Sequence, residues 1–203
     1  MTLKFLNNSQ SLTCFILKSI LAGITIGFGC IVYVLHGGIL GSFLFSLALL
    51  TVVMQNMNLY TGKIGYIKNI KDFMYMMLMA VFNFIGIGLF AWMMTFTSLD
   101  YSSVNTIIQN KLSMPDISSF ILAICCGVMM YIAVDNFKKA LHPFFIIMPI
   151  MLFILCGFEH CIANVGYFVL GQTDVTLDSI SKVLIYVAGN AVGSLIYSKL
   201  NPS

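Results

Sequence analysis

Long apolar segments separated by short polar stretches dominate this sequence. Of its 203 residues, 60% are hydrophobic and 8% are charged, whereas a typical soluble domain has about 25% charged residues. A helix that crosses the hydrocarbon core of a bilayer needs about 20 apolar residues, so the chain has room for about six crossings and no sizeable soluble domain. We therefore expect an all-α integral membrane protein with six transmembrane helices, over residues 14–35, 41–54, 73–98, 117–134, 140–170 and 177–197.

Two of these six segments are interrupted by residues that do not suit a continuous helix. Residues 55–62 break the second segment, and Cys156-Gly157-Phe158 breaks the fifth after residue 155. Unsatisfied backbone groups at membrane depth are tolerated only where protein or water meets them. The N-terminus of a half-helix also offers N–H donors and a partial positive charge to an anion. The two breaks therefore predict a site that favours small anions or their conjugate acids.

The two halves of the chain, about 14–98 and 117–199, carry a weak internal repeat. With three crossings in each half, the second half is inverted in the membrane, and paired broken helices then build a substrate site near the midplane. We expect one transmembrane channel domain over residues 1–203, with a 3+3 inverted repeat. The repeated positions, at offsets of 107, 106 and 104 residues, are Asn83-Phe84-Ile85-Gly86 with Asn190-Ala191-Val192-Gly193, Asn58 with Asn164, and Gly23 with Gly127.

The charged residues indicate topology. The net charge of +3 comes from ten lysines without arginine, scattered so that no basic stripe for nucleic acid forms. Lysine-rich loops face the cytoplasm, which predicts that both termini and the loops after the second and fourth crossings lie on the cytoplasmic side of the cell (inner) membrane. The lysines concerned are Lys4, Lys18, Lys63, Lys68, Lys71, Lys138, Lys139 and Lys199.

The six cysteines suggest neither a disulfide framework nor a metal site. All of them lie in apolar runs, and none forms a C-x-x-C or zinc-finger spacing. Thiols in apolar surroundings are usually inert, so we expect small packing residues and no cofactor.

The segment Gly157-Phe158-Glu159-His160-Cys161-Ile162-Ala163-Asn164 places ionisable groups inside a long apolar stretch. Such groups cost at least a few kcal/mol in the hydrocarbon, so they usually face a wet cavity or a transport path. We expect these residues to face a transport path. Glu159 has two interpretations: it braces the second half-helix by accepting backbone N–H bonds, or it contacts the substrate.

These residues resemble the formate/nitrite transporter family of pentameric, aquaporin-like channels, over nearly the whole chain. The resemblance implies a homopentamer in the lipid bilayer that conducts a small monovalent anion together with a proton, with formate first and then nitrite or hydrosulfide. The segments that carry it are Leu59-Tyr60-Thr61-Gly62, Gly157-Phe158-Glu159-His160 with Ala163-Asn164, and the two N-x-x-G segments.

The resemblance also implies roles for individual residues, all numbered as in this sequence. His160 is the central pore histidine, accompanied by Thr61, Asn164 and Glu159, and Lys111 lies in the outer vestibule. The remaining roles are an inner apolar constriction of Phe45, Leu49 and Phe153, an outer constriction of Leu59, Tyr60 and Met130, and helix packing or pore lining by Asn83, Gly86, Asn190 and Gly193.

The chain departs from the family pattern at three of these positions or their neighbours. Asn58 occupies a position where Glu is common in the family, Tyr60 one where Phe is common, and Gly127 one where Asn is common. These changes leave the fold expectation intact.

The expected mechanism begins with an anion drawn toward Lys111 and then facing an apolar slit that a charge crosses poorly. Formate, nitrite and hydrosulfide each have a neutral conjugate acid, so protonation removes the charge that opposes passage through the slit. Imidazole titrates closest to neutral pH, which allows His160 to relay the proton. A neutral His160 that only donates a hydrogen bond, with the proton taken from bulk water, fits the sequence equally well.

Other interpretations stay open at this stage. A membrane enzyme could use Glu159 and His160 as an acid–base pair, but no nucleophile motif, H-E-x-x-H cluster or nucleotide fingerprint is present. An aquaporin-like facilitator of small neutral solutes would use His160 as a polar lining residue. Lys182, near the outer end of the last crossing, either snorkels to the interface or acts as a second vestibule lysine.

Overall fold

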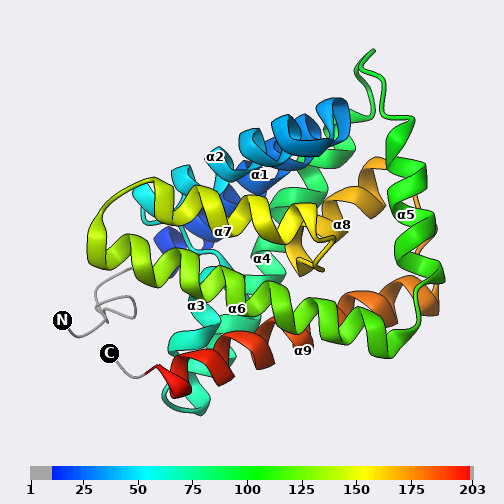
Figure 1. Cartoon of the computed structure of the whole chain (residues 1–203). Coiled ribbons are helices and arrows are strands. Elements are labelled where there is room, and N and C mark those ends of the chain that lie inside the picture. Colours follow the sequence, from blue (N-terminus) through cyan, green and yellow to red (C-terminus); the bar gives the residue numbers. More distant parts are fainter. Residues whose placement is uncertain (1–10, 202–203) are drawn as a thin grey trace.

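The computed structural model describes residues 11–201, and every regular element in that range is a helix. The expected all-α class is confirmed (Figure 1). The elements are α1 (Leu12–His36), α2 (Gly38–Met54), α3 (Tyr60–Lys63), the 3-10 turn η2 (Ile64–Tyr66), α4 (Ile70–Met94), α5 (Ser103–Ser113), α6 (Asp116–Ala140), α7 (Phe144–Leu155), α8 (Cys161–Leu170) and α9 (Leu177–Leu200).

Four helices, α1, α4, α6 and α9, are long and apolar enough to cross a membrane, by length and composition. The shorter apolar helices α2, α7 and α8 belong to the two interrupted segments. Large apolar side chains such as Trp92, Phe96 and Leu184 are exposed on the outside of the bundle, as in a protein whose surface meets lipid rather than water.

The helices pack in two matching pairs, α1 against α4 and α6 against α9, with α2 against α7 between them (Figure 1). Glycines permit the close approach in both pairs. A Cβ added at Gly23 would lie 2.2 Å from the carbonyl oxygen of Asn83, and one at Gly127 would lie 2.2 Å from that of Asn190. The N-x-x-G segments therefore lie at helix contacts, as small residues do in membrane proteins.

Both interruptions are five residues long. The first covers residues 55–59, because α3 begins at Tyr60, so it is shorter than the expected 55–62. The second covers residues 156–160 rather than 156–158 alone. Each break contains a residue with positive φ at the matching place, Asn56 at 51° and Gly157 at 69°. These are residue types that tolerate the left-handed region.

Two buried asparagines brace the breaks in the same way. The side-chain oxygen of Asn83 accepts from the N–H of Tyr60 at 2.9 Å, and its Nδ2 donates to the carbonyls of Asn58 and Ser19, both at 2.7 Å. These bonds satisfy backbone groups that water cannot reach.

Asn190 makes the corresponding bonds in the second half. It accepts from the N–H of Cys161 at 2.9 Å and donates to the carbonyls of Glu159 and Ala123, both at 2.8 Å. Asn58 is therefore the counterpart of Glu159. The expected pairing of Asn58 with Asn164 is wrong, because the offset between the breaks is 101 residues and not 106.

Two regions differ from the sequence expectation. Residues 103–113, which fall between two expected crossings, form α5, which lies along one end of the bundle (Figure 1). Helix α6 continues to Ala140, beyond the expected end of the crossing at residue 134, so Asp135 and Lys139 are helical and form an ion pair of 2.8 Å one turn apart.

The bundle has two distinguishable ends, which are named here for later use. The α6–α7 turn and the C-terminal end of α9 lie at one end in Figure 1, and α5 lies at the other. We call the first the lysine-rich end, because its helix ends and turns carry Lys138, Lys139 and Lys199. The second is the α5 end.

Candidate pore site

His160 lies at the centre of the bundle, where the two broken segments meet. Its Nε2 is 2.9 Å from the hydroxyl oxygen of Thr61 on α3, and the residue is 2% exposed. Its Nδ1 accepts from the N–H of Ala163 at 3.1 Å, so the imidazole caps the N-terminus of α8. Because Nδ1 is the acceptor of this bond, the proton of a neutral ring sits on Nε2 and faces Thr61.

An aromatic side chain fixes the plane of this imidazole. The ring of Phe153 on α7 is stacked on that of His160, with the centroids 5.8 Å apart and the planes 13° apart. The ring of Phe45 on α2 meets Phe153 edge to face at 6.3 Å. The stack and the cap together leave His160 one orientation, in which Nε2 is the atom available to a ligand.

Glu159, next to the histidine, belongs to an ion pair. Its Oε2 lies 2.5 Å from Nζ of Lys111 on α5, and it accepts from Nδ2 of Asn164 at 2.6 Å. Glu159 is 1% exposed, and a buried carboxylate needs such partners. The alternative that Glu159 caps α8 through backbone N–H groups is wrong, because His160 provides that cap.

A cavity of about 290 Å³ leads from the α5 end to this group. Lys111 and Asn110 of α5 line it, and Glu159, His160 and Asn164 form part of its wall. Within residues 11–201, no cluster of three or more His, Cys, Asp or Glu side chains could hold a metal ion. The cavity wall presents an ammonium group paired with a carboxylate, two amides and an imidazole ring.

The cavity also shows where the aromatic constriction lies. Phe45 and Phe153 line the same cavity as Lys111, so they lie on the α5 side of the site. The sequence expectation placed them in an inner constriction, opposite to the Lys111 vestibule, and this order is wrong. The family resemblance selected Phe45 and Phe153 together, and their rings do meet, but it could not relate them to α5, which was not expected.

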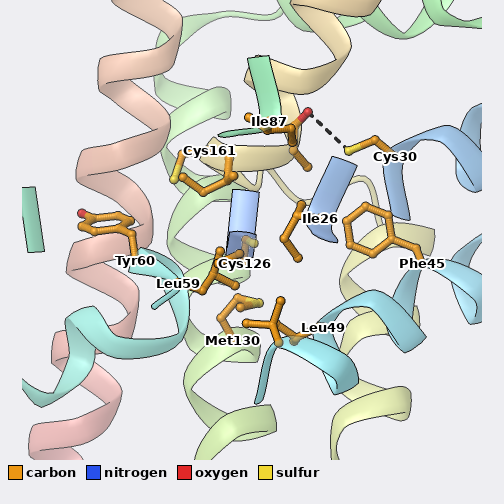
Figure 2. Close-up of a cluster of buried hydrophobic side chains, with 14 of the residues drawn as sticks. Ile26, Cys30, Phe45, Leu49, Leu59, Tyr60, Ile87, Cys126, Met130 and Cys161 are labelled. Carbon is orange, nitrogen blue, oxygen red and sulfur yellow. Dashed lines mark hydrogen bonds between the residues drawn. The ribbon is translucent and has the colours of Figure 1, made fainter. Parts of the chain in front are cut away.

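A second apolar cluster lies outside this cavity. Leu49, Leu59 and Met130 are each at most 2% exposed, and Figure 2 shows their side chains pointing toward one another. None of the three lines the cavity that contains Lys111. Leu49 thus joins Leu59 and Met130 rather than Phe45, contrary to the expected grouping.

Tyr60 does not belong to this apolar cluster, although it was expected there. Its hydroxyl donates to the carbonyl of Val187 on α9 at 3.1 Å, and Figure 2 shows its ring pointing away from Leu49 and Met130. The hydroxyl that distinguishes Tyr60 from Phe explains the difference, because a buried phenol needs an acceptor and finds one on α9.

Some cavity residues were not identified from the sequence. Tyr33 on α1 and Tyr167 on α8 both line the cavity. Tyr167 could have been found, because His160, Ala163, Asn164 and Tyr167 follow the i, i+3, i+4, i+7 spacing of one helix face. Tyr33 carries no comparable signal.

Lys182 has a structural role in place of the two that were expected. Its Nζ donates to Oδ1 of Asp116 at 2.7 Å, to the hydroxyl of Ser119 at 3.2 Å and to the carbonyl of Met114. The residue is 5% exposed, so it does not snorkel, and it does not line the cavity. It ties α9 to the start of α6.

Comparison with known proteins identifies what this arrangement resembles. The family model described as formate/nitrite transporter matches residues 6–201. A curated relative, the formate channel FocA of Haemophilus influenzae, is 31% identical over 167 residues, which cover 76% of this chain and 55% of the relative. The chain thus spans about half the length of that curated relative.

Two solved structures share the fold. One, described as an FNT family ion channel, has a TM-score of 0.86 and 21% identity, and the match covers 97% of this chain and 91% of that one. The other, a pentameric formate channel with formate bound, has a TM-score of 0.77 and 22% identity, with 92% and 94% covered. At these identities the likeness concerns the fold.

Proposed function

The chain belongs to the formate/nitrite transporter family, and on this premise we propose that it is a membrane channel for small monovalent anions of weak acids. Formate is the first candidate, because the similar proteins include a formate channel and a pentameric channel with formate bound. Nitrite and hydrosulfide, which share the charge and small size, are the next candidates.

The observation that carries this proposal is the cavity that joins Lys111 to His160. It begins at α5 and ends at a buried imidazole held between the two broken helices. An ammonium group attracts anions, and half-helix N-termini at membrane depth provide further positive potential. A site for neutral solutes would not need a partly buried lysine at its mouth.

His160 acts in this proposal as a neutral hydrogen-bond donor. Protonating Nδ1 would break its bond with the N–H of Ala163 and uncap α8, so the geometry supports a ring that keeps one proton, on Nε2. Formate takes up the proton from water at the α5 end, before the neutral acid enters the apolar part of the path. The ring of His160 keeps its orientation, and Nε2–H donates to an oxygen of the arriving acid in place of Thr61.

Two apolar constrictions flank the histidine. On the α5 side the path passes the edge-to-face pair of Phe45 and Phe153, and beyond His160 it passes Leu49, Leu59 and Met130. A charged carboxylate would lose its hydration at either constriction. The neutral acid loses much less, which is why the proposal couples anion entry to protonation.

The assembly follows from the same premise. We take the four long helices and the two interrupted pairs as six crossings in a 3+3 inverted repeat, which the matching asparagine braces support. The lysine-rich end then faces the cytoplasm with both termini, in the cell (inner) membrane. A homopentamer is supported by the pentameric channel of the same fold.

Flux measurements in proteoliposomes test the proposal. Vesicles containing the protein are loaded with formate, nitrite, hydrosulfide or acetate and subjected to a pH gradient, with His160→Ala and Lys111→Ala variants alongside. We expect saturable anion flux that rises on acidification and falls in both variants. Flux of glycerol or water, without anion flux at any pH, would instead identify a facilitator of neutral solutes.

A further inference from the structure

Two tyrosine side chains line the cavity at the α5 end, and the proposed function gives them no role. Tyr33 comes from α1 and Tyr167 from α8, and the centroids of their rings are 6.4 Å apart. Tyr167 is also close to the ion pair of the cavity, because Nζ of Lys111 lies 6.0 Å from the centroid of its ring. The two phenols therefore line the part of the cavity at which an anion attracted by Lys111 arrives.

The hydroxyl of Tyr33 is available to a ligand. It forms no hydrogen bond with another residue of the range that the structure describes, and the side chain is partly exposed at the cavity wall. A phenol carries one O–H donor at neutral pH. A molecule in the cavity can accept a hydrogen bond from this donor without breaking a bond inside the protein.

The hydroxyl of Tyr167 has a weak partner, the sulfur of Cys30 on α1. The thiol of Cys30 in turn donates to the carbonyl oxygen of Ala163, with sulfur and oxygen 3.7 Å apart (Figure 2). A thiol sulfur is a weak acceptor, whereas an ionised oxygen is a strong one. An oxyanion that reaches the cavity can therefore take the hydrogen bond of Tyr167 from Cys30.

Neither phenol is bonded to a carboxylate, unlike the ammonium group of Lys111. Nζ of Lys111 lies 2.5 Å from Oε2 of Glu159, so an anion has to share this cation with a buried carboxylate. Glu159 is bonded to Lys111 and Asn164, and not to Tyr33 or Tyr167. The two hydroxyls thus offer hydrogen bonds for which the anion competes with no charged group.

Such donors distinguish between the candidate anions. Formate and nitrite each have two oxygen atoms, which can accept hydrogen bonds from two hydroxyls at once. Hydrosulfide has a single sulfur atom, and sulfur accepts hydrogen bonds more weakly than oxygen does. The ammonium group of a lysine acts as a point charge and makes no comparable distinction. Phenol donors in the cavity therefore favour oxyanions, whereas Lys111 attracts small anions in general.

We propose that Tyr33 and Tyr167 form an oxyanion-selective binding site in the cavity at the α5 end, where their hydroxyls hold the two oxygens of formate or nitrite. This inference deepens the proposed channel function and rests on it. It assigns the preference for formate and nitrite over hydrosulfide to two hydroxyl groups. The anion is held there before it takes up a proton and reaches His160.

The test measures the KM of uptake into proteoliposomes for formate, nitrite and hydrosulfide, after subtraction of the flux into protein-free vesicles. Tyr33→Phe and Tyr167→Phe each remove one hydroxyl and keep the ring, so the packing beside Lys111 is retained. We expect each variant to raise the KM for formate and for nitrite about fivefold, as for the loss of one hydrogen bond. The maximal rates and the KM for hydrosulfide should stay at the parent values.

Tyr75→Phe on α4 is the matched control, because it removes the same hydroxyl from a side chain that is exposed outside the bundle, and it should leave all three KM values unchanged. Tyr33→Phe keeps the test decisive if Tyr167→Phe fails to fold, since the Tyr33 hydroxyl has no bond within the described residues to lose. An unchanged formate KM in either folded variant, or an equal rise for hydrosulfide, would overturn the tyrosine site and leave the channel function intact. Absence of saturable flux of all three anions in the parent protein would instead overturn the proposed function.

Discussion

Nζ of Lys111 lies 2.5 Å from Oε2 of Glu159, so the cation that faces the cavity from α5 already has a carboxylate partner. The lysine side chain is 12% exposed and the glutamate 2%, which makes this a largely buried ion pair at the wall of the cavity. An entering anion competes with Glu159 for the same ammonium group. The affinity of the α5 end is therefore set by two residues and not by Lys111 alone.

Removing either member of this pair should change anion affinity in opposite directions. Glu159→Gln frees Lys111 for the anion and should lower the formate KM about fivefold. Lys111→Gln leaves an unpaired buried carboxylate, so it should raise the KM and cost about 3 to 5 kcal/mol of stability. Flux titrations and thermal unfolding in detergent measure the two effects.

The double variant Lys111→Gln, Glu159→Gln serves as the control for this pair. It removes both charges, so its stability should return close to that of the parent protein. If the double variant is as unstable as Lys111→Gln, the loss comes from packing and not from the unpaired charge.

The cap made by His160 separates its structural role from its role in transport. Asn is a good N-cap residue and Ala a poor one, so His160→Ala should be less stable than His160→Asn by about 1 kcal/mol. Both variants lose the Nε2–H donor and should conduct less. Thermal unfolding, compared with formate flux of the same preparations, distinguishes the two roles.

The pH dependence of the same variants identifies the source of the proton. If water protonates formate, His160→Asn should show reduced flux with the same dependence on external pH as the parent protein. A flux that no longer changes with pH in His160→Asn would indicate that the imidazole supplies the proton, and the neutral-donor mechanism would have to be abandoned.

The aromatic pair on the α5 side should set the size limit of the path. Phe153→Ala removes both the stack on His160 and the edge-to-face contact with Phe45. We expect the acetate-to-formate flux ratio to rise roughly tenfold, since the space of a methyl group decides such discrimination. Leu152→Ala on the same helix, whose side chain is exposed outside the bundle, should leave the ratio unchanged.

Much of the fold could be predicted from the sequence, because each membrane crossing appears there as a long run of apolar residues. The four long helices and both breaks lie where apolar runs begin, stop and resume. Helix α5 was not predictable in this way. It is an 11-residue helix of mixed polarity that is held by tertiary contacts, including the buried side chains of Val104 and Ile108 and a bond from Ser103 to the carbonyl of Val34.

Because α5 was not predicted from the sequence, most of the incorrect predictions about the site concern residues near that helix. The structure brings together Lys111, Glu159 and His160, which were selected from the sequence, but their partners depend on where α5 crosses the bundle. The order of the constrictions depends on the same fact. The pairing of Asn58 with Glu159 was missed because the two halves differ in loop length, so that no single offset relates all equivalent positions.

The glycines of the N-x-x-G segments allow a last prediction, about helix packing within each half of the chain. A Cβ at Gly86 would lie 2.1 Å from the carbonyl oxygen of Ile20, and one at Gly193 would lie 2.0 Å from that of Ile124. Backbone atoms cannot yield as a flexible side chain does, so the helices of each pair must separate to admit even a methyl group. Gly86→Ala and Gly193→Ala should each destabilise the protein by about 1 to 3 kcal/mol.

Gly88→Ala is the matched control on α4, because nothing lies within 4 Å of its added Cβ, and it should unfold at the parent temperature or slightly above. Thermal unfolding of the three variants in one detergent makes the comparison, and equal melting temperatures for Gly86→Ala and Gly88→Ala would show that the α1–α4 contact is looser than described here.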